Sequence, residues 1–173
     1  MEIKDAIDLI SFPVKEGVQT WADLGCGSGL FTKALASLLP KDSTIYAIDV
    51  DAKAIQKIPK EYNGIRIETA AMDFSSAAFP FHQLDGILMA NSLHYVKDKE
   101  AFLKRLMNVV KESGCFLLVD YDMTKANQWV PYPLPIAAAE ELFLKCGVSS
   151  FQVLNKRKSV FGERMMYGTL IKR

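Results

Sequence analysis

Two kinds of hydrophobic pattern alternate along this chain. Short apolar runs are typical of strands, and segments whose apolar side chains recur every three or four positions are typical of helices. Strands are predicted at residues 21–24, 43–48, 65–69, 84–90 and 115–119. Between them, helices are predicted at residues 30–39, at 52–58, and in a segment that Asp98 caps and Gly114 ends. Because strands and helices alternate, we expect a parallel sheet with helices on both faces.

The last third of the chain departs from this alternation. An irregular stretch, residues 121–135, precedes a predicted helix at 136–145, and two strand-like runs follow at 151–155 and 165–171. A polar turn around Gly162 separates these runs without a helix between them, so they must form a hairpin. We therefore expect a doubly wound α/β sandwich of three layers, in which a seven-stranded, mostly parallel sheet has its last strand antiparallel.

The first 17 residues are only weakly amphipathic. Ile3, Ala6, Ile7, Leu9 and Ile10 predict a short helix, which the Ser11-Phe12-Pro13 segment ends. Two roles fit this helix equally well. It can pack on a bare edge of the core, or it can lie over a bound ligand as a lid.

A glycine-rich turn joins the first strand to the first long helix. Its sequence is Asp23-Leu24-Gly25-Cys26-Gly27-Ser28-Gly29. Glycine lets the backbone approach a ligand without a Cβ in the way, and a helix start offers N–H groups without intrahelical partners. A plain strand-to-helix turn needs one glycine rather than three, so the spacing favours a ligand-binding loop.

Three polar residues follow other predicted strands. In an open parallel sheet, ligands bind beyond the carboxyl ends of the strands, and Asp49, Asp73 and Asn91 stand at such ends. Asp49 lies 20 residues after Gly29, an offset at which a carboxylate can accept hydrogen bonds from both hydroxyls of a ribose. Asp73 lies between Met72 and Phe74, which indicates a slot for an adenine ring with a carboxylate for its amine.

Composition narrows the classes of protein. The chain has 173 residues, half of them apolar, which suits one domain over residues 1–173. A net charge of +1 predicts neither a nucleic-acid partner nor a membrane surface. Three widely spaced cysteines and two histidines predict no metal site and a reducing compartment. The N-terminus does not look like a signal peptide, so we expect a cytoplasmic protein.

The glycine turn and the strand-end residues together resemble class I S-adenosylmethionine-dependent methyltransferases of the small, generic type. The resemblance is carried by residues 23–29, by Ile48-Asp49-Val50-Asp51, by Ala71-Met72-Asp73-Phe74, and by residues 85–88 leading to Asn91-Ser92-Leu93-His94-Tyr95-Val96. It covers residues 18–120 well, the closing hairpin by topology only, and residues 1–17 hardly at all. It implies the strand order 3-2-1-4-5-7-6.

The resemblance also implies roles for individual residues. S-adenosylmethionine would be the cofactor, with residues 18–120 as its half of the domain and 121–173 as the substrate side. The backbone of Gly25 to Gly27 would pass under its methionine part, and Asp23 would brace the loop. Asp49 would hold the ribose, Met72, Asp73 and the Phe74 N–H would surround the adenine, and Asn91 would lie near the amino group. Leu24, Cys26 and Val50 complete the implied cofactor contacts.

A dinucleotide site is the rival for such a glycine turn. The dinucleotide motif G-x-G-x-x-G places its third glycine one position later than Gly29, and Asp23 is foreign to it. We therefore rank an NAD-dependent oxidoreductase well below a methyltransferase.

The methyl acceptor is not specified by these motifs. His94 and Tyr95 follow the fourth strand, where an acceptor would bind, and His94 is either a general base or a packed turn residue. Tyr121, Trp129 and Tyr132 either line a substrate pocket or anchor a loop. A small-molecule acceptor is expected, with the chain a monomer or homodimer. The alternatives are a cofactor-binding subunit that needs a partner and a methyltransferase acting on protein or RNA.

Overall fold

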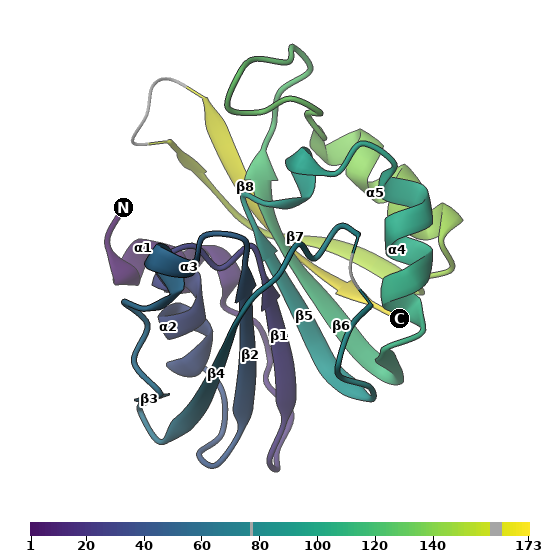
Figure 1. The fold of residues 1–173 in the computed structure, drawn as a ribbon. Coiled ribbons are helices and arrows are strands. Elements are labelled where there is room, and N and C mark those ends of the chain that lie inside the picture. The colour runs from purple at the N-terminus through teal and green to yellow at the C-terminus, as the bar shows by residue number, and fades with distance from the viewer. Residues whose placement is uncertain (77, 160–163) are drawn as a thin grey trace.

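The protein is a three-layer α/β/α sandwich (Figure 1). The computed structural model describes residues 1–76, 78–159 and 164–173. Its central sheet has eight strands in the order β3-β4-β2-β1-β5-β6-β8-β7. Strands β4, β2, β1, β5 and β6 pair in parallel, and β8 is antiparallel to both β6 and β7. The order predicted for the seven main strands is therefore confirmed.

The elements follow one another as expected for repeated strand and helix units. The strands are β1 (Thr20–Leu24), β2 (Thr44–Asp49), β3 (Glu61–Tyr62), β4 (Ile65–Ala71), β5 (Leu84–Ala90), β6 (Val110–Tyr121), β7 (Ser150–Lys158) and β8 (Met165–Lys172). The helices are α1 (Ile3–Ile10), α2 (Leu30–Ala36), α3 (Ala52–Ile55), the 3₁₀ turn η1 (Leu93–Tyr95), α4 (Lys99–Met107) and α5 (Ile136–Lys145). Among the described helices, none is long and apolar enough to cross a membrane.

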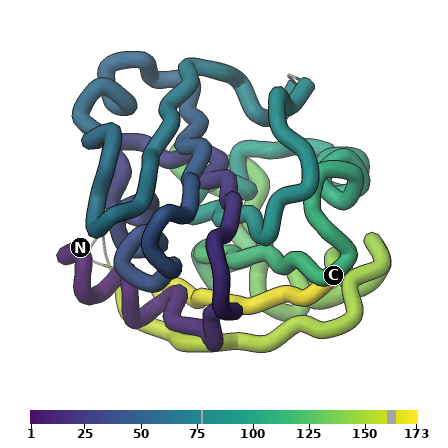
Figure 2. The backbone as a smooth tube through the Cα atoms, turned by 90° about the horizontal axis from the view of Figure 1, so that it is seen from below, coloured from purple at the N-terminus to yellow at the C-terminus, as the bar shows by residue number. Residues whose placement is uncertain are grey.

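Both faces of the sheet are covered, and successive residues of its central strands serve opposite faces. In β5, Ile87 and Met89 pack in the cluster that includes α4 and α5, whereas Leu88 and Ala90 pack in the cluster that includes α1 and α2. Strands buried on both faces carry continuous apolar runs, which is why β5 and β6 have little polar alternation. Figure 2 shows the N-terminal segment crossing beneath the yellow C-terminal strand.

Helix α1 is anchored on the sheet beside α2. Ala6, Leu9 and Ile10 are buried, and a Cβ added to Gly168 of β8 would lie 1.9 Å from the Leu9 carbonyl oxygen. At the start of the helix, Asp5 forms an ion pair with Arg157 of β7 at 2.6 Å. These contacts correspond to the packing role for residues 1–17, and the lid stays a prediction.

The eighth strand is a correction to the predicted count of seven. Tyr62 pairs antiparallel with Ile65 across a two-residue turn, and Asn63 and Gly64 both have positive φ angles, 53° and 79°. An Asn-Gly pair is the strongest short-range signal for such a hairpin. The sequence carries this turn signal, but the two residues of β3 before it are too few to show a strand pattern.

Three predicted helix ends were also wrong. Helices α2 and α3 stop at Ala36 and Ile55, each three residues before the predicted end, and α4 stops at Met107 rather than before Gly114. Val110 already begins β6, and Gly114 lies within that strand, where a Cβ would meet the Asp85 carbonyl oxygen at 3.1 Å. Val109 and Val110 extend the helical stripe of apolar residues, but they are buried beyond the end of the helix, where the sheet begins. The predicted turn at Gly162 lies outside the described residues.

Candidate functional site

The glycine loop, residues 25–29, is held by its own backbone hydrogen bonds. The N–H groups of Gly25 and Cys26 both donate to the Ile48 carbonyl of β2, at 2.8 and 3.0 Å. A Cβ on Gly25 would lie 2.4 Å from the Ser92 Cβ, so this glycine is required by packing. A Cβ on Gly27 would meet nothing within 4 Å, so the loop has an open side there. That open side is where a ligand can approach the backbone.

Asp23 lies under this loop and is completely buried. The Thr32 hydroxyl of α2 donates to Asp23 Oδ2 at 2.6 Å, but Oδ1 has no hydrogen-bond partner among the described residues. Burial raises the pKa of Asp23 to about 7, an effect that the Thr32 hydrogen bond opposes and the nearby Asp49 charge reinforces. Thr32 thus ties Asp23 to α2, and the role predicted for Asp23 in bracing the loop stays a prediction.

Asp49 ends β2 and supports the glycine loop directly. Its Oδ2 accepts the Gly27 N–H at 2.7 Å, and its Oδ1 accepts the Asp51 N–H at 2.9 Å. A carboxylate has about four acceptor sites, so it can also accept ribose hydroxyls. Asp51 caps α3 through the N–H groups of Lys53 and Ala54, as its position indicates. Val50 between them is 67% exposed, which is unusual for a large apolar side chain and suits a ligand contact.

Asp73 and Phe74 have local partners in the structure. Asp73 accepts hydrogen bonds from the Ser75 N–H and hydroxyl and from the Ser76 hydroxyl, and these bonds hold the pKa of the Asp73 carboxyl below its usual value. The Phe74 ring turns into the core against Phe102, with ring centroids 5.7 Å apart. The roles predicted for Met72, Asp73 and Phe74 beside an adenine stay predictions.

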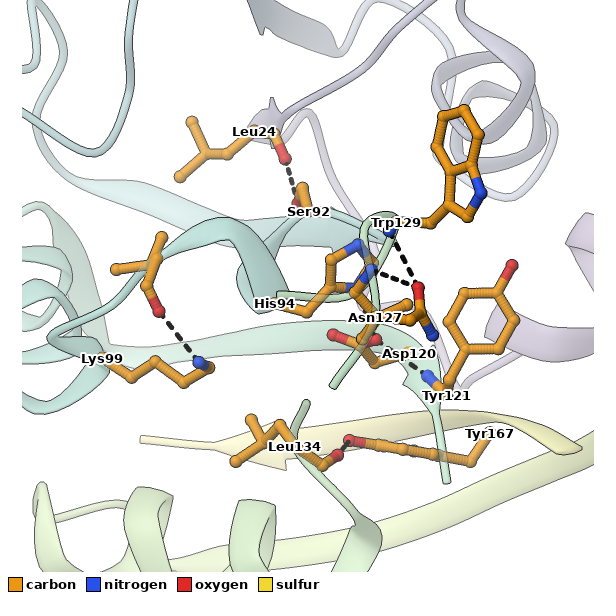
Figure 3. A network of polar contacts seen from close by, with 12 residues as sticks. Leu24, Ser92, His94, Lys99, Asp120, Tyr121, Asn127, Trp129, Leu134 and Tyr167 are labelled. Atoms are coloured by element: carbon orange, nitrogen blue, oxygen red, sulfur yellow. Dashed lines mark hydrogen bonds and ion pairs between the residues drawn. The ribbon is translucent and has the colours of Figure 1, made fainter. Parts of the chain in front are cut away.

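Asn91 and Ser92 follow the end of β5, next to the end of its neighbour β1. The Ser92 hydroxyl donates to the Leu24 carbonyl at 2.6 Å, as Figure 3 shows, and ties the end of β5 to the start of the glycine loop. Asn91 has a positive φ of 55°, which turns the chain sharply at the strand end. Its Oδ1 is buried with no partner among the described residues. Because β1 and β5 are neighbours, Asp23 and Asn91 leave two unpaired acceptors at adjacent strand ends.

His94 forms a buried pair with a residue that the sequence analysis missed. Its Nδ1 lies 2.7 Å from Asp120 Oδ1, and the two side chains are 2% and 0% exposed (Figure 3). Asp120 lies one residue before the end of β6, the strand next to β5, so the two residues meet although they are 26 positions apart in the chain. The signal available in the sequence was the strand-end rule that selected Asp49, which also applies to the Asp that follows the apolar run at 115–119.

An aromatic pocket of about 700 Å³ opens beside His94. The proline-rich loop, residues 122–135, forms one of its walls, and the Tyr132 N–H donates to the His94 carbonyl at 3.0 Å. Within that loop, Asn127 Oδ1 accepts the Trp129 and Val130 N–H groups at 2.8 and 3.0 Å. The pocket is lined by Asn91, His94, Tyr95, Tyr121, Trp129, Val130 and Arg164.

Comparison with protein families identifies the family to which this chain belongs. Residues 22–114, just over half of the chain, match the model of a family described as a methyltransferase domain. The chain belongs to the methyltransferase-domain family. The class I methyltransferase expected from the glycine turn and the strand-end residues is confirmed.

Relatives of known sequence or structure agree with this membership. An uncharacterised methyltransferase of Mycobacterium tuberculosis is 27% identical over 113 residues, which cover 65% of this chain and 56% of the relative. A solved S-adenosylmethionine-dependent methyltransferase of Methanosarcina mazei superposes with a TM-score of 0.68 at 18% identity, covering 94% of this chain and 97% of its own. An arsenic(III) S-adenosylmethionine methyltransferase of Chlamydomonas reinhardtii gives 0.70 at 15% identity, covering 98% and 72%. At such identities the structural likeness shows the fold alone.

This methyltransferase fold brings most of the predicted residues to one edge of the sheet. Asp23, Asp49 and Asn91 lie at the ends of β1, β2 and β5, which are neighbouring strands. His94 lies on the same edge beside Asp120 and lines the aromatic pocket, whereas Tyr132 does not line it.

The polar groups at this edge fit S-adenosylmethionine. The cofactor carries an ammonium group and two ribose hydroxyls as donors, and the site offers buried acceptors at Asp23 and Asn91 and the Asp49 carboxylate. Gly27 adds room for close approach of the cofactor to the backbone.

Proposed function

We propose that this protein transfers a methyl group from S-adenosylmethionine to a small molecule bound in the aromatic pocket. The observation that carries the proposal is the pair of unpaired acceptors, Asp23 Oδ1 and Asn91 Oδ1, at the ends of adjacent strands. Burying an acceptor without a donor costs about 1–3 kcal/mol, so a ligand with a cationic donor group is favoured at that edge.

The residues that would hold the cofactor lie on four strand ends. Asp23 and Asn91 would accept hydrogen bonds from its ammonium group, and Asp49 would accept them from its ribose hydroxyls. Val50 and Met72 would contact the adenine. The cofactor, when bound, supplies a methyl group on a sulfonium that needs only an aligned nucleophile. The chain itself supplies alignment, through a loop fixed by the Ile48 carbonyl, and a pocket in which the acceptor is held.

The pocket supports a small acceptor over a macromolecule. Its volume of about 700 Å³ is within the range of small-molecule sites. Tyr95, Tyr121 and Trp129 offer flat apolar surfaces, and Arg164 is the one arginine or lysine among the described residues that line the pocket. Flat acceptors that are neutral or anionic suit such a lining.

Calorimetry and label transfer test the proposal together. The protein should bind S-adenosylmethionine and not NAD, and Asp49→Ala should weaken that binding. Radiolabelled methyl groups should then appear in a metabolite pool rather than in peptide or RNA pools. Equal binding by the wild type and Asp49→Ala would overturn the cofactor site. Label found only in RNA or protein, or only after addition of a second protein, would overturn the small-molecule acceptor.

A further inference from the structure

We propose that His94, oriented by Asp120, is the general base that removes the proton of a hydroxyl acceptor bound in the aromatic pocket. This role rests on the proposed methyl transfer and narrows the acceptor to molecules with an O–H group, with the aromatic lining favouring a hydroxyl on an aromatic ring. Asp120 is a positioning residue, since it touches His94 and not the pocket.

The geometry of the pair leaves one ring nitrogen for the acceptor. A carboxylate can only accept, so Nδ1 of His94 carries the hydrogen in the 2.7 Å contact with Asp120. In the neutral imidazole the other nitrogen, Nε2, then has a lone pair. Nε2 has no hydrogen-bond partner in the described part of the chain, and His94 lines the pocket. His94 therefore presents a proton acceptor to whatever the pocket binds.

Asp120 is held so that it fixes this arrangement. Its Oδ1 also accepts the Tyr121 N–H at 2.8 Å, while Oδ2 is buried with no partner within residues 1–76, 78–159 and 164–173. A carboxylate that is fully buried and supports a histidine holds the ring tautomer and stabilises the imidazolium that proton transfer creates. A packed turn histidine does not require a buried carboxylate behind it, since burying that charge is costly.

The other titratable groups around the pair leave this role to His94. Burial raises the pKa of Tyr95, with Tyr121 and Asp120 adding to the effect, so the Tyr95 hydroxyl stays protonated. Tyr167 of β8 also faces Asp120, and burial raises its pKa, while its hydroxyl donates to the Leu134 carbonyl at 2.6 Å. Burial lowers the pKa of Lys99, although Asp120 opposes the change, and Lys99 donates to the Val96 carbonyl at 2.8 Å. Arg164, on the pocket wall, cannot accept a proton.

Oxygen acceptors need a base in a way that softer nucleophiles do not. As the acceptor oxygen bonds to the methyl carbon, its O–H bond breaks and the proton moves to Nε2. The electron pair of the former sulfur–methyl bond stays on sulfur, and the imidazolium later returns its proton to water. A thiol is already partly deprotonated in solvent as the pH nears its pKa, and a neutral amine can lose its proton after attack. A buried histidine base therefore indicates an O-methyl product.

Nitrogen NMR tests the geometry without any activity. The chain has two histidines, and the second, His82, is exposed and serves as an internal reference. Long-range proton–nitrogen spectra above the titration of the ring should show His94 with a protonated Nδ1 and a bare Nε2. Asp120→Asn should abolish this preference and leave the His82 signals unchanged. A His94 that is protonated at Nε2 in the wild type would overturn the proposal.

Kinetics separate a base from a packing residue. A hydroxybenzoate serves as the oxygen probe and a thiophenol as the sulfur probe. In His94→Gln the rate of methyl transfer to oxygen should fall by about 100-fold or more. The rate of transfer to sulfur and the affinity for the cofactor should be retained. For the oxygen probe, the acid limb of the kcat/KM profile should vanish in His94→Gln and persist in the control His82→Gln. Unchanged transfer to oxygen in His94→Gln, or a natural product methylated on sulfur, would overturn the base.

Failure of the proposed function has a different signature. If wild-type protein does not bind S-adenosylmethionine in calorimetry, methyl transfer itself is excluded, whatever the state of His94. If the protein binds the cofactor but His94 is protonated at Nε2, the proposed methyl transfer stands and the role of His94 as general base is excluded.

Discussion

The glycine loop keeps its shape through backbone hydrogen bonds, whereas the aromatic pocket is shaped by side chains. The loop is tied to β2 by the Ile48 carbonyl and by Asp49. The pocket depends on His94 and Asp120, which are 26 positions apart, and on a loop that Asn127 organises. The first region can accept few substitutions because a Cβ at Gly25 would clash with Ser92 and because the Asp49 carboxylate holds the Gly27 N–H. The second can change its lining residues while the sheet beneath stays intact.

This difference separates stability from specificity. A substitution in the glycine loop should disturb folding and cofactor binding together, because Gly25 packs on Ser92 and the same backbone faces the ligand. A substitution in the pocket lining should change which acceptor is used and leave the fold alone.

The largest effect is expected at Gly25. Alanine there would place a Cβ 2.4 Å from the Ser92 Cβ at a φ of 80°, so Gly25→Ala should lower stability by about 3 kcal/mol or more and abolish cofactor binding. Thermal denaturation measures the first effect and calorimetry the second. Gly27→Ala is the matched control, since its Cβ meets nothing within 4 Å, and it should cost only about 1–2 kcal/mol. Equal losses for the two alanines would show that packing on Ser92 does not fix the loop.

The next effect is expected at Asp49. Asp49→Ala removes the acceptor of the Gly27 and Asp51 N–H groups and the expected ribose partner, so cofactor affinity should fall by about 100-fold, the equivalent of two charge-assisted hydrogen bonds. Asp51→Ala removes only the cap of α3 and should cost about 1 kcal/mol of stability with little change in affinity. Comparable affinity losses in the two variants would contradict a ribose contact at Asp49.

The glycine-loop half was predictable because its chemistry is local in the sequence. Asp23 and three glycines form one continuous motif, and the order of the parallel strands brings Asp49 and Asn91 beside it. The pocket half could not be read in this way. Its key contact joins η1 to the end of β6, and the turns of the proline-rich loop depend on Asn127, which no periodic pattern marks.

The errors in the fold have similar causes. The apolar stripe after Asp98 continues to Val110 with helical spacing, but tertiary pairing with β5 ends the helix at Met107. Periodicity alone cannot distinguish a buried helix end from the start of a buried strand. The short β3 was missed because a strand of two residues is too short to show any periodic pattern. Its sequence signal is the Asn-Gly turn that follows it.

A smaller effect is expected from the proton on Asp23. Burial raises the pKa of Asp23 to about 7 in the folded protein from its usual value of 3.8, so between these values the folded state holds a proton that the unfolded state loses. Stability should therefore fall as pH rises from about 4 to about 7, by up to about 1.4 kcal/mol per pH unit, and level off above. An ammonium ligand favours the ionised carboxylate, so cofactor binding near pH 6 should release a proton.

Calorimetry in buffers of different ionisation enthalpy detects that proton. Asp23→Asn should remove both the release and the fall in stability with pH, since it cannot ionise, and should bind the cofactor more weakly. A wild type that binds the cofactor without proton release near pH 6 would exclude Asp23 as a partner of its ammonium group.

The smallest effects, and the sharpest contrast between the two regions, are expected from two exposed apolar residues. Trp129 on the pocket wall and Val50 beside Asp49 are 69% and 67% exposed, so neither alanine variant should change the melting temperature by more than about 2 °C. Trp129→Ala should raise the KM for the acceptor by about tenfold and leave the cofactor Kd unchanged, because it removes one face of the pocket. Val50→Ala should do the reverse, raising the cofactor Kd about threefold through lost contact with the adenine. If Trp129→Ala weakened cofactor binding as much as acceptor binding, the glycine loop and the aromatic pocket would form one continuous site rather than two separable regions.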